Sequence, residues 1–397
     1  MLKKIAWKNI VYKPLNTALC VSLLFFGVGI ISLLLLIQHQ LEQKFARDLK
    51  DIDLVVGAKG SPLQLVLSAV YHLDAPTGNI KLAEARKIME APIVKEAIPL
   101  AYGDSYQGYR ILGTTDAYVK KYDAQLRDGR LFSKSMETTI GSDIAEKTGL
   151  KLGDTFLGTH GDVKGGDVHD EHPYTVVGIL EKTNSVVDQL LLTNLESVWV
   201  VHAHPAGDGS SPAIIADSMD ITAILLQYKS KMALFNMPRV INDQTTMQAV
   251  LPAFQINQLF YMLGIGATTL QLIAGGIMVM AGFSVFFVLF NRLRERKFEL
   301  ALMRTVGYRP WQLFGLLLLE GLLLAIVGYV LGWLLSRAGL YIVNQQAEGD
   351  FNFHFSSGWI IEEAWLFLIT ILVGVGAALL PAWQAMRMKI SDVLSEK

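Results

Sequence analysis

Histidines and acidic side chains gather in one glycine-rich stretch, THGDVKGGDVHDEHPY, at residues 159–174. Imidazole nitrogens and carboxylate oxygens suit Zn²⁺ and similar divalent ions. His169 and His172 are three residues apart, close enough to fall on one side of a turn. The stretch therefore holds a candidate zinc site formed by His160, His169, Asp170 and His172. The alternative is a polar loop whose histidines are simply solvated.

The sequence lacks the short motifs of several large enzyme classes. We find no G-x-x-x-x-G-K-[ST] phosphate loop, no H-E-x-x-H and no G-x-S-x-G. We therefore expect no enzyme activity, no cofactor bound by this chain apart from the candidate zinc, and an energy source on another polypeptide. The net charge of −1 shows no excess of basic residues of the kind that binds nucleic acid. The single cysteine, Cys20, excludes an internal disulfide.

A charged stretch, RERKFELALMRTVGYRP at residues 294–310, lies between two apolar runs. Six basic residues fall between Arg292 and Arg309, with Glu295 and Glu299 among them. One face of a short helix is predicted by the i, i+3, i+4, i+7 spacing of Phe298, Ala301, Leu302 and Thr305. Gly307 can adopt the left-handed conformation that ends a helix, and Pro310 prevents the helix from continuing. The segment is either a solvated basic loop or a helix shaped to bind a partner.

Membrane spans are indicated by a composition of 52% apolar and only 18% charged residues, against about 25% charged in soluble domains. Four apolar runs are each long enough to cross the hydrocarbon core of a bilayer. We place these spans at residues 17–38, 257–290, 311–336 and 359–381. Glu320 is the intramembrane polar candidate, because ionisable residues inside membranes are often functional. Close packing between helices is predicted at Gly275, Gly276, Gly282, Gly328 and Gly332.

Between the first and second spans, residues 39–256 alternate short strand patterns with helical ones. DLVVGAK, YRILGTT, YTVVGIL and ITAILLQY read as strands, whereas KLAEARKIME and GSDIAEKTG read as helices. The sequence thus predicts an α-helical membrane protein with a large extracytoplasmic α+β domain, whose ends extend the neighbouring spans as stalks. The apolar residues 63–71 read as a buried helix or as an exposed patch for a partner.

Charge asymmetry sets the expected orientation. Residues 38–256 hold 27 acidic against 21 basic residues, whereas four lysines and no acid precede the first span. The positive-inside rule then puts both termini and the charged stretch in the cytoplasm. The remaining predicted segments are a cytoplasmic interfacial helix (1–16), the cytoplasmic helix (291–310), a short external loop (337–358) and a cytoplasmic tail (382–397).

The stretch RKFELALMRTVGYRPWQLFGLLLLEGLLL resembles the signature of FtsX-like and MacB-like ABC transporter permeases. Glu299, Leu302, Arg304, Gly307 and the downstream Glu320 match the family pattern, while Ala301 stands where glycine is usual. IAEKTGLKLGDTFLG followed by YTVVGIL, and the closing LLPAWQAMRMKISDVLSEK, are similar to other family elements. The resemblance covers essentially the whole chain.

The resemblance implies a four-span subunit of the bacterial inner membrane that works as a dimer, homo- or heteromeric. A separate cytosolic ABC ATPase would bind ATP and Mg²⁺ and contact the coupling residues Arg296, Glu299, Leu302, Arg304 and Gly307. By mechanotransmission, the ATPase would move the extracytoplasmic domain of this chain for export or extraction of a substrate. Membrane lipid, a periplasmic adaptor, a lipoprotein or a hydrolase are the further partners to consider.

Two other functions remain open from the residues alone. The same architecture could be an ATP-driven regulatory scaffold that controls an envelope hydrolase or a sensor. The histidine-rich loop would instead suit a zinc-linked transport component.

Overall fold

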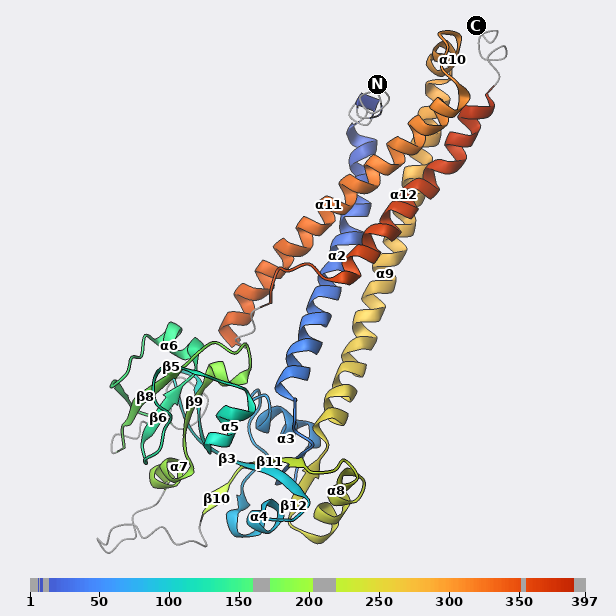
Figure 1. The fold of residues 1–397 in the computed structure, drawn as a ribbon. Coiled ribbons are helices and arrows are strands. Elements are labelled where there is room, and N and C mark those ends of the chain that lie inside the picture. Colours follow the sequence, from blue (N-terminus) through green and yellow to red (C-terminus); the bar gives the residue numbers. More distant parts are fainter. Residues whose placement is uncertain are drawn as a thin grey trace, which may run out of the picture. The chain divides into compact units, whose positions relative to one another are not determined.

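The computed structural model describes residues 6, 8, 9, 14–159, 172–202, 219–350 and 355–388 (Figure 1). The chain forms two compact units. We call Met1–Leu41 with Met262–Lys397 the helical unit, and Glu42–Tyr261 the sheet unit. Helices α2 and α9 run from one unit into the other, so the two units share continuous backbone.

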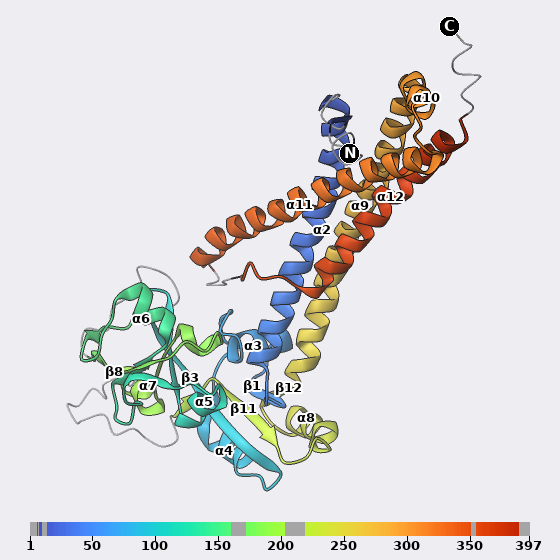
Figure 2. The same ribbon diagram turned by 45° about the horizontal axis from the view of Figure 1, so that its top comes forward.

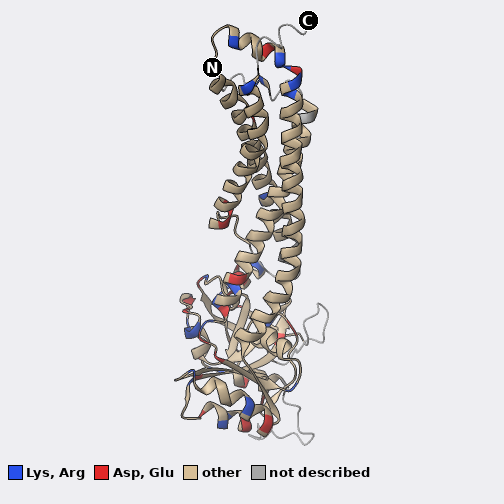
Figure 3. Ribbon diagram, turned by 90° about the vertical axis from the view of Figure 1, so that its right-hand side faces the viewer, with Lys and Arg blue, Asp and Glu red and all other residues tan. Residues whose placement is uncertain are grey.

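Five helices make up most of the helical unit: α2 (Pro14–Asp48), α9 (Pro252–Glu295), α10 (Lys297–Thr305), α11 (Pro310–Asp350) and α12 (Ile361–Arg387). Four of them are long and apolar enough to span a membrane: Thr17–Asp48, Pro252–Glu295, Pro310–Gln345 and Ile361–Arg387. Charged residues are sparse along these helices and gather near α10 (Figure 3). The predicted fold class, four membrane helices with a large α+β domain after the first, is confirmed.

Helix α11 continues to Asp350, beyond the end predicted at residue 336. The sequence prediction ended the span at the first charge, Arg337. No proline follows in residues 337–350, so nothing there breaks the backbone ladder. The polar residues of this segment prolong the helix instead of forming a loop.

Glycines bring α11 close to two neighbouring helices. A Cβ atom built on Gly328 would lie 2.5 Å from the Leu24 Cβ of α2, and one on Gly332 would lie 2.8 Å from the Val28 Cβ. Gly321 in α11 faces Gly374 in α12, and these two helices run side by side (Figure 2). The predicted close packing is thus confirmed at Gly328 and Gly332.

The other predicted packing glycines lie on α9. Gly282 approaches Val373 of α12, where an added Cβ would be 3.1 Å from a valine methyl group. A Cβ atom built on Gly275 or on Gly276 would meet no atom within 4 Å in the part of the chain that the structure describes. Close packing of this pair inside one chain is therefore not observed.

The sheet unit is built on a mostly antiparallel sheet of ten strands. Nine strands follow the order β12-β1-β11-β3-β4-β9-β6-β8-β5, β7 pairs with β8, and β10 and β2 form a separate ribbon. The strands are β1 (Leu54–Ala58), β2 (Ile80–Lys81), β3 (Val94–Tyr106), β4 (Tyr109–Thr114), β5 (Leu126–Gly129), β6 (Glu137–Ile140), β7 (Thr155–Phe156), β8 (Tyr174–Leu180), β9 (Leu190–Asn194), β10 (Asp220–Ile221), β11 (Ala223–Tyr228) and β12 (Met247–Val250). Parallel pairing occurs between β4 and β9 and between β6 and β8.

Short helices pack against this sheet: α3 (Pro62–Ala69), α4 (Leu82–Met89), α5 (Asp116–Lys121), α6 (Ser142–Thr148), the 3₁₀ turn η1 (Val186–Gln189), α7 (Leu195–His202) and α8 (Ala233–Gln244). In α3, Leu65 and Val66 are buried, and Gly57 of β1 leaves room for Leu65, whose methyl a Cβ there would approach to 2.5 Å. The apolar stretch at 63–71 is thus a buried helix, as the first of its two predicted readings had it.

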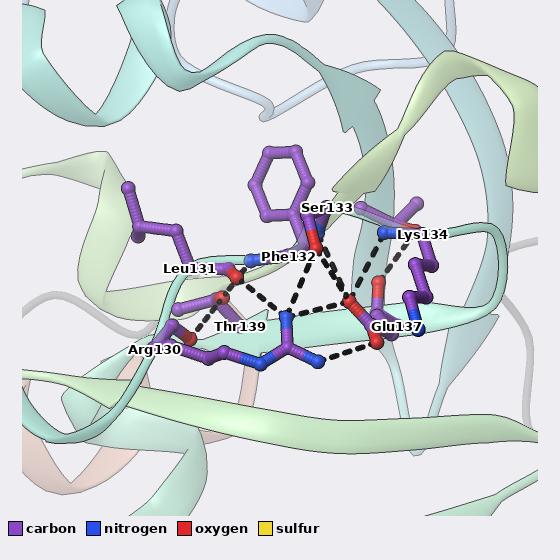
Figure 4. Close-up of polar contacts among 8 residues, drawn as sticks. Arg130, Leu131, Phe132, Ser133, Lys134, Glu137 and Thr139 are labelled. Atoms are coloured by element: carbon purple, nitrogen blue, oxygen red, sulfur yellow. Dashed lines mark hydrogen bonds and ion pairs between the residues drawn. The ribbon is translucent and has the colours of Figure 1, made fainter.

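The loop between β5 and β6 is closed by a clasp of charged and polar groups (Figure 4). The guanidinium of Arg130 donates to both carboxylate oxygens of Glu137, at 2.5 and 2.7 Å. The backbone N–H groups of Ser133 and Lys134 donate to the same carboxylate, each at 3.0 Å. The side-chain hydrogen bonds from Arg130 hold the pKa of Glu137 well below its usual range. The clasp therefore stays ionised at neutral pH.

Candidate functional site

Helix α10 is the short amphipathic element that the charged stretch predicted. Helix α9 ends at Glu295, Arg296 takes a non-helical conformation, and α10 begins at Lys297. At the other end, Gly307 has φ of +105°, and Tyr308 N–H donates to Met303 C=O at 3.1 Å. This left-handed residue stops the helix before Pro310 opens α11. The sequence predicted one cytoplasmic helix at 291–310, whereas in the structure α9 ends at Glu295 and α10 is separated from it by Arg296.

One face of α10 is anchored to the helical unit. Leu300 and Ala301 are buried, and Leu300 belongs to an apolar cluster with Leu293, Leu313, Leu317, Ala382 and Ala385. Arg304 donates from Nη1 to the backbone C=O of Met388 at 2.8 Å, just after α12 ends. α10 is therefore held in place by contacts with three neighbouring helices, α9, α11 and α12.

The opposite face of α10 is an exposed apolar stripe. Phe298, Leu302 and Val306, spaced four residues apart, are 46%, 52% and 76% exposed. Glu299 lies beside them with 59% of its side chain exposed, and it accepts a hydrogen bond from Arg296 Nε at 2.6 Å. A rigid helix with bulky apolar residues at i, i+4 and i+8 next to a carboxylate suits docking into a groove on a partner protein.

The structure sorts the predicted coupling residues into two roles. Glu299 and Leu302 lie on the exposed face, and Gly307 shapes the end of the helix. Arg304 faces inward to Met388, so its bond is part of the anchor. Sequence reasoning placed Ala301 on the face of Phe298 and Leu302, but Ala301 is buried. The i, i+4, i+8 spacing of Phe298, Leu302 and Val306 was the signal for the exposed stripe, and Val306 was missed.

Glu320, the predicted intramembrane acid, is 2% exposed and is held within the chain. Asn9 Nδ2 donates to its Oε1 at 2.6 Å, and Arg292 Nη1 lies 3.9 Å from its Oε2. Arg292 also donates from Nη2 to Thr17 Oγ1 at 2.7 Å. This network joins the residues before α2 to the end of α9, next to α10, which favours a positioning role for Glu320.

A second buried ion pair was not predicted from the sequence. Arg337 of α11 binds both carboxylate oxygens of Glu363 of α12, at 2.7 and 2.8 Å. Ser32 of α2 donates to the same carboxylate at 2.6 Å, and its Oγ lies 2.9 Å from Ser336 Oγ. The sequence placed Arg337 and Glu363 at the edges of two spans, and only the packing of the helices reveals that they meet.

The candidate zinc site falls largely outside the described residues: His160, His169 and Asp170 are not among them, and His172 is. Among the residues that the structure describes, no group of three or more histidine, cysteine or acidic side chains could hold a metal ion. Zinc binding by the loop therefore stays a prediction.

Family models match nearly the whole length of the chain in two consecutive parts. The MacB-like periplasmic core domain matches residues 17–248, and the FtsX-like permease C-terminal model matches residues 272–390. The first match alone covers more than half of the chain.

Individual relatives are more distant. A macrolide export ATP-binding/permease protein MacB from Bordetella avium is 23% identical over 77% of this chain and 46% of its own length. An uncharacterized ABC transporter permease protein from Mycobacterium tuberculosis is 25% identical over 75% of this chain and 34% of its own length. This chain thus spans less than half the length of both curated relatives.

Among solved structures, the periplasmic region of MacB from Actinobacillus actinomycetemcomitans covers 55% of this chain and 98% of its own, at 12% identity and a TM-score of 0.36. The family assignment rests on the two family models and on the four apolar helices, one before and three after the sheet unit in the sequence. With these observations together, the chain belongs to the MacB/FtsX-like family of ABC transporter permeases and is a multi-pass membrane protein.

Proposed function

We propose that this protein is a permease subunit that couples a separate cytosolic ABC ATPase to movement of its sheet unit. The observation that carries the proposal is the exposed stripe of Phe298, Leu302 and Val306 on the anchored helix α10. Covering these exposed apolar side chains with a partner lowers the free energy, because it removes apolar surface from water. Glu299 adds a charge that selects a complementary basic partner surface.

The proposed orientation puts α10 and both termini in the cytoplasm and the sheet unit outside the inner membrane. The basic residues around α10 support this orientation through the positive-inside rule. The match of residues 17–248 to a periplasmic core domain agrees with it. ATP and Mg²⁺ then belong to the partner, and this chain contributes contacts and movement.

The route of coupling follows the continuous helices. When nucleotide draws the ATPases together, the docked α10 moves with them and shifts α9 and α11, between which it lies in the chain. Helix α9 has 44 residues, about 66 Å at about 1.5 Å per residue, and its first residues belong to the sheet unit. A displacement at α10 can therefore reach the sheet unit without passing through a flexible linker.

In this proposal two permease copies, identical or related, work with two ATPases to export or extract a substrate on the outer side. The outer-side partner, whether an adaptor, a lipoprotein or a hydrolase, is the feature that would tell transport from regulation. Nothing in the described structure favours the regulatory scaffold or the zinc-linked component.

Replacing Glu299 by arginine tests the docking face directly. The matched control is Glu295→Arg, the same substitution on an exposed residue four positions earlier. The protein would be purified from its own membranes at native expression and its bound proteins identified by mass spectrometry. We expect an ABC ATPase with the wild type and with Glu295→Arg, and at least tenfold less of it with Glu299→Arg.

Either of two results would overturn the docking assignment. One is equal recovery of the ATPase with both variants at equal expression, and the other is no ATPase with the wild type. A hydrolase or kinase recovered beside the ATPase would redirect the function toward regulation.

A further inference from the structure

The connection between α11 and α12 is tied to its neighbours through its backbone. We call residues 355–358 the strap; two residues separate them from α12, which begins at Ile361. Asn344 of α11 exchanges two hydrogen bonds with Phe355: its Nδ2 donates to Phe355 C=O and its Oδ1 accepts from Phe355 N–H, both at 2.9 Å. Arg337 of α11 donates from Nη2 to Gly358 C=O at 3.1 Å. Both ends of the strap are therefore held by α11.

The middle of the strap is bound by a different helix. Gln40 of α2 donates from Nε2 to Ser356 C=O at 2.8 Å, and its Oε1 accepts from Ser356 N–H at 2.5 Å. A side-chain amide that satisfies both backbone groups of one residue copies the pairing of two strands and fixes orientation as well as distance. Gln40 precedes Leu41, the last residue of α2 that belongs to the helical unit.

The buried ion pair of Arg337 and Glu363 joins the same three helices. Glu363 of α12 is fully buried and receives hydrogen bonds from Arg337 of α11 and Ser32 of α2. Removing one partner of a buried pair leaves an uncompensated charge in the interior, so this contact resists separation. Ser32 and Gln40 are eight residues apart, about two helical turns, and both bind residues of the α11–α12 pair or of the strap between them.

We propose that Gln40 and the strap form a clamp through which α11 and α12 hold α2 at the point where it leaves the helical unit. In this arrangement α2 moves together with α11 and not independently of it. The role of the clamp in coupling rests on the proposed function, because α11 begins directly after α10. The clamp gives a movement at α10 a second route, through α11 and Gln40 to α2, beside the direct route through α9.

The clamp itself can be tested without any ATPase. The full-length protein in lipid nanodiscs would be compared with Gln40→Ala by hydrogen–deuterium exchange. We expect amide exchange to rise at least tenfold in residues 355–358 and in the last turns of α2 before Leu41, while the middle of α9 stays unchanged. The matched control is Gln345→Ala, which removes a glutamine that bonds Tyr341 within α11.

Wild-type exchange in Gln40→Ala would overturn the clamp. Asn344→Leu provides a second variant of similar size that loses both the acceptor for Phe355 N–H and the donor to Phe355 C=O. Its expected effect is faster exchange at Phe355 with correct folding elsewhere. No change at Phe355 would also contradict the clamp.

Adding the co-purified ATPase and a non-hydrolysable ATP analogue tests the coupling role. In the wild type we expect nucleotide to change exchange in the strap and in residues 42–48 of α2. In Gln40→Ala the change should persist in the strap and be smaller in residues 42–48, where only the route through α9 remains. A response of wild-type size in residues 42–48 would overturn transmission through the clamp. A wild type that shows no nucleotide response would overturn the proposed function and with it the coupling role, while the exchange comparison without ATPase still decides the clamp.

Discussion

His72 is held in one tautomer by two tyrosines of the sheet unit. Its Nδ1 lies 2.5 Å from Tyr102 Oη and its Nε2 lies 2.7 Å from Tyr118 Oη. Because the Tyr102 hydroxyl donates to the backbone C=O of Ser68, Nδ1 must carry the proton toward Tyr102. Nε2 is then free to accept from the Tyr118 hydroxyl. The imidazole is therefore neutral, and a second proton would remove that acceptor.

This arrangement predicts acid sensitivity of the sheet unit. Burial lowers the pKa of His72 to about 3, and the nearby Arg110 guanidinium acts in the same direction. In the unfolded chain a histidine has a pKa of about 6.5, so it binds more protons than the folded one between these values. The contribution of His72 to stability is thus constant above about pH 6.5 and falls as the pH drops below it, by up to about 2 kcal/mol at pH 5.

Chemical denaturation of the full-length protein at pH 7.5 and pH 5, followed by proteolysis of the sheet unit, measures this loss. His72→Gln should remove the His72 contribution to this loss, whereas Tyr118→Phe should leave that contribution because the imidazole remains. Equal pH dependence in the wild type and His72→Gln would contradict the assignment.

Single residues also show the limit of sequence reasoning about the site. Glu299 and Arg304 are both charged and both match the family pattern, yet Glu299 is exposed while Arg304 bonds to Met388 after α12. The pattern gives their spacing on α10, but only the packing of α12 beside it decides which one is free for a partner. Arg337 and Glu363 escaped prediction for the same reason, since their contact depends on helices that are distant in sequence.

At the scale of elements, the local signals were reliable wherever short-range chemistry determines the structure. The strands β1, β4 and β8 and the helices α4 and α6 lie where the sequence patterns predicted them. α6 is followed by Gly149 with φ of +74°, the left-handed residue expected after a helix. The end of α11 was missed because hydrophobicity detects the lipid-facing part of a helix and not its polar extension to Asp350.

Close packing of α2 and α11 yields a prediction at this scale. Gly328→Ala would place a Cβ 2.5 Å from the Leu24 Cβ, so the helices must separate, at a cost of about 1–3 kcal/mol. The control is Gly276→Ala on α9, where an added Cβ meets no atom of the described chain within 4 Å. Thermal unfolding in detergent, followed by circular dichroism, should show a lower midpoint for Gly328→Ala alone. Equal midpoints for both variants would contradict the packing.

For the whole molecule, the order of elements was predictable because short stretches of sequence are enough to indicate membrane spans and turns. The family models confirm the same order, with the periplasmic core match ending before the permease match begins. The substrate and the outer-side partner were not predictable, because the sequence of a binding surface does not identify the molecule that binds to it. The structure narrows the search to one surface: the Phe298, Leu302 and Val306 stripe of α10.

The most direct test of the account is a photo-crosslinking amino acid placed at Leu302 in cells that express the protein at its native level. Trp359, 64% exposed beside the strap, is the control position. After illumination, adducts would be purified and identified by mass spectrometry. The account predicts that Leu302 captures an ABC ATPase and that Trp359 does not. An ATPase captured equally at both positions, or at neither, would contradict the proposed docking of α10.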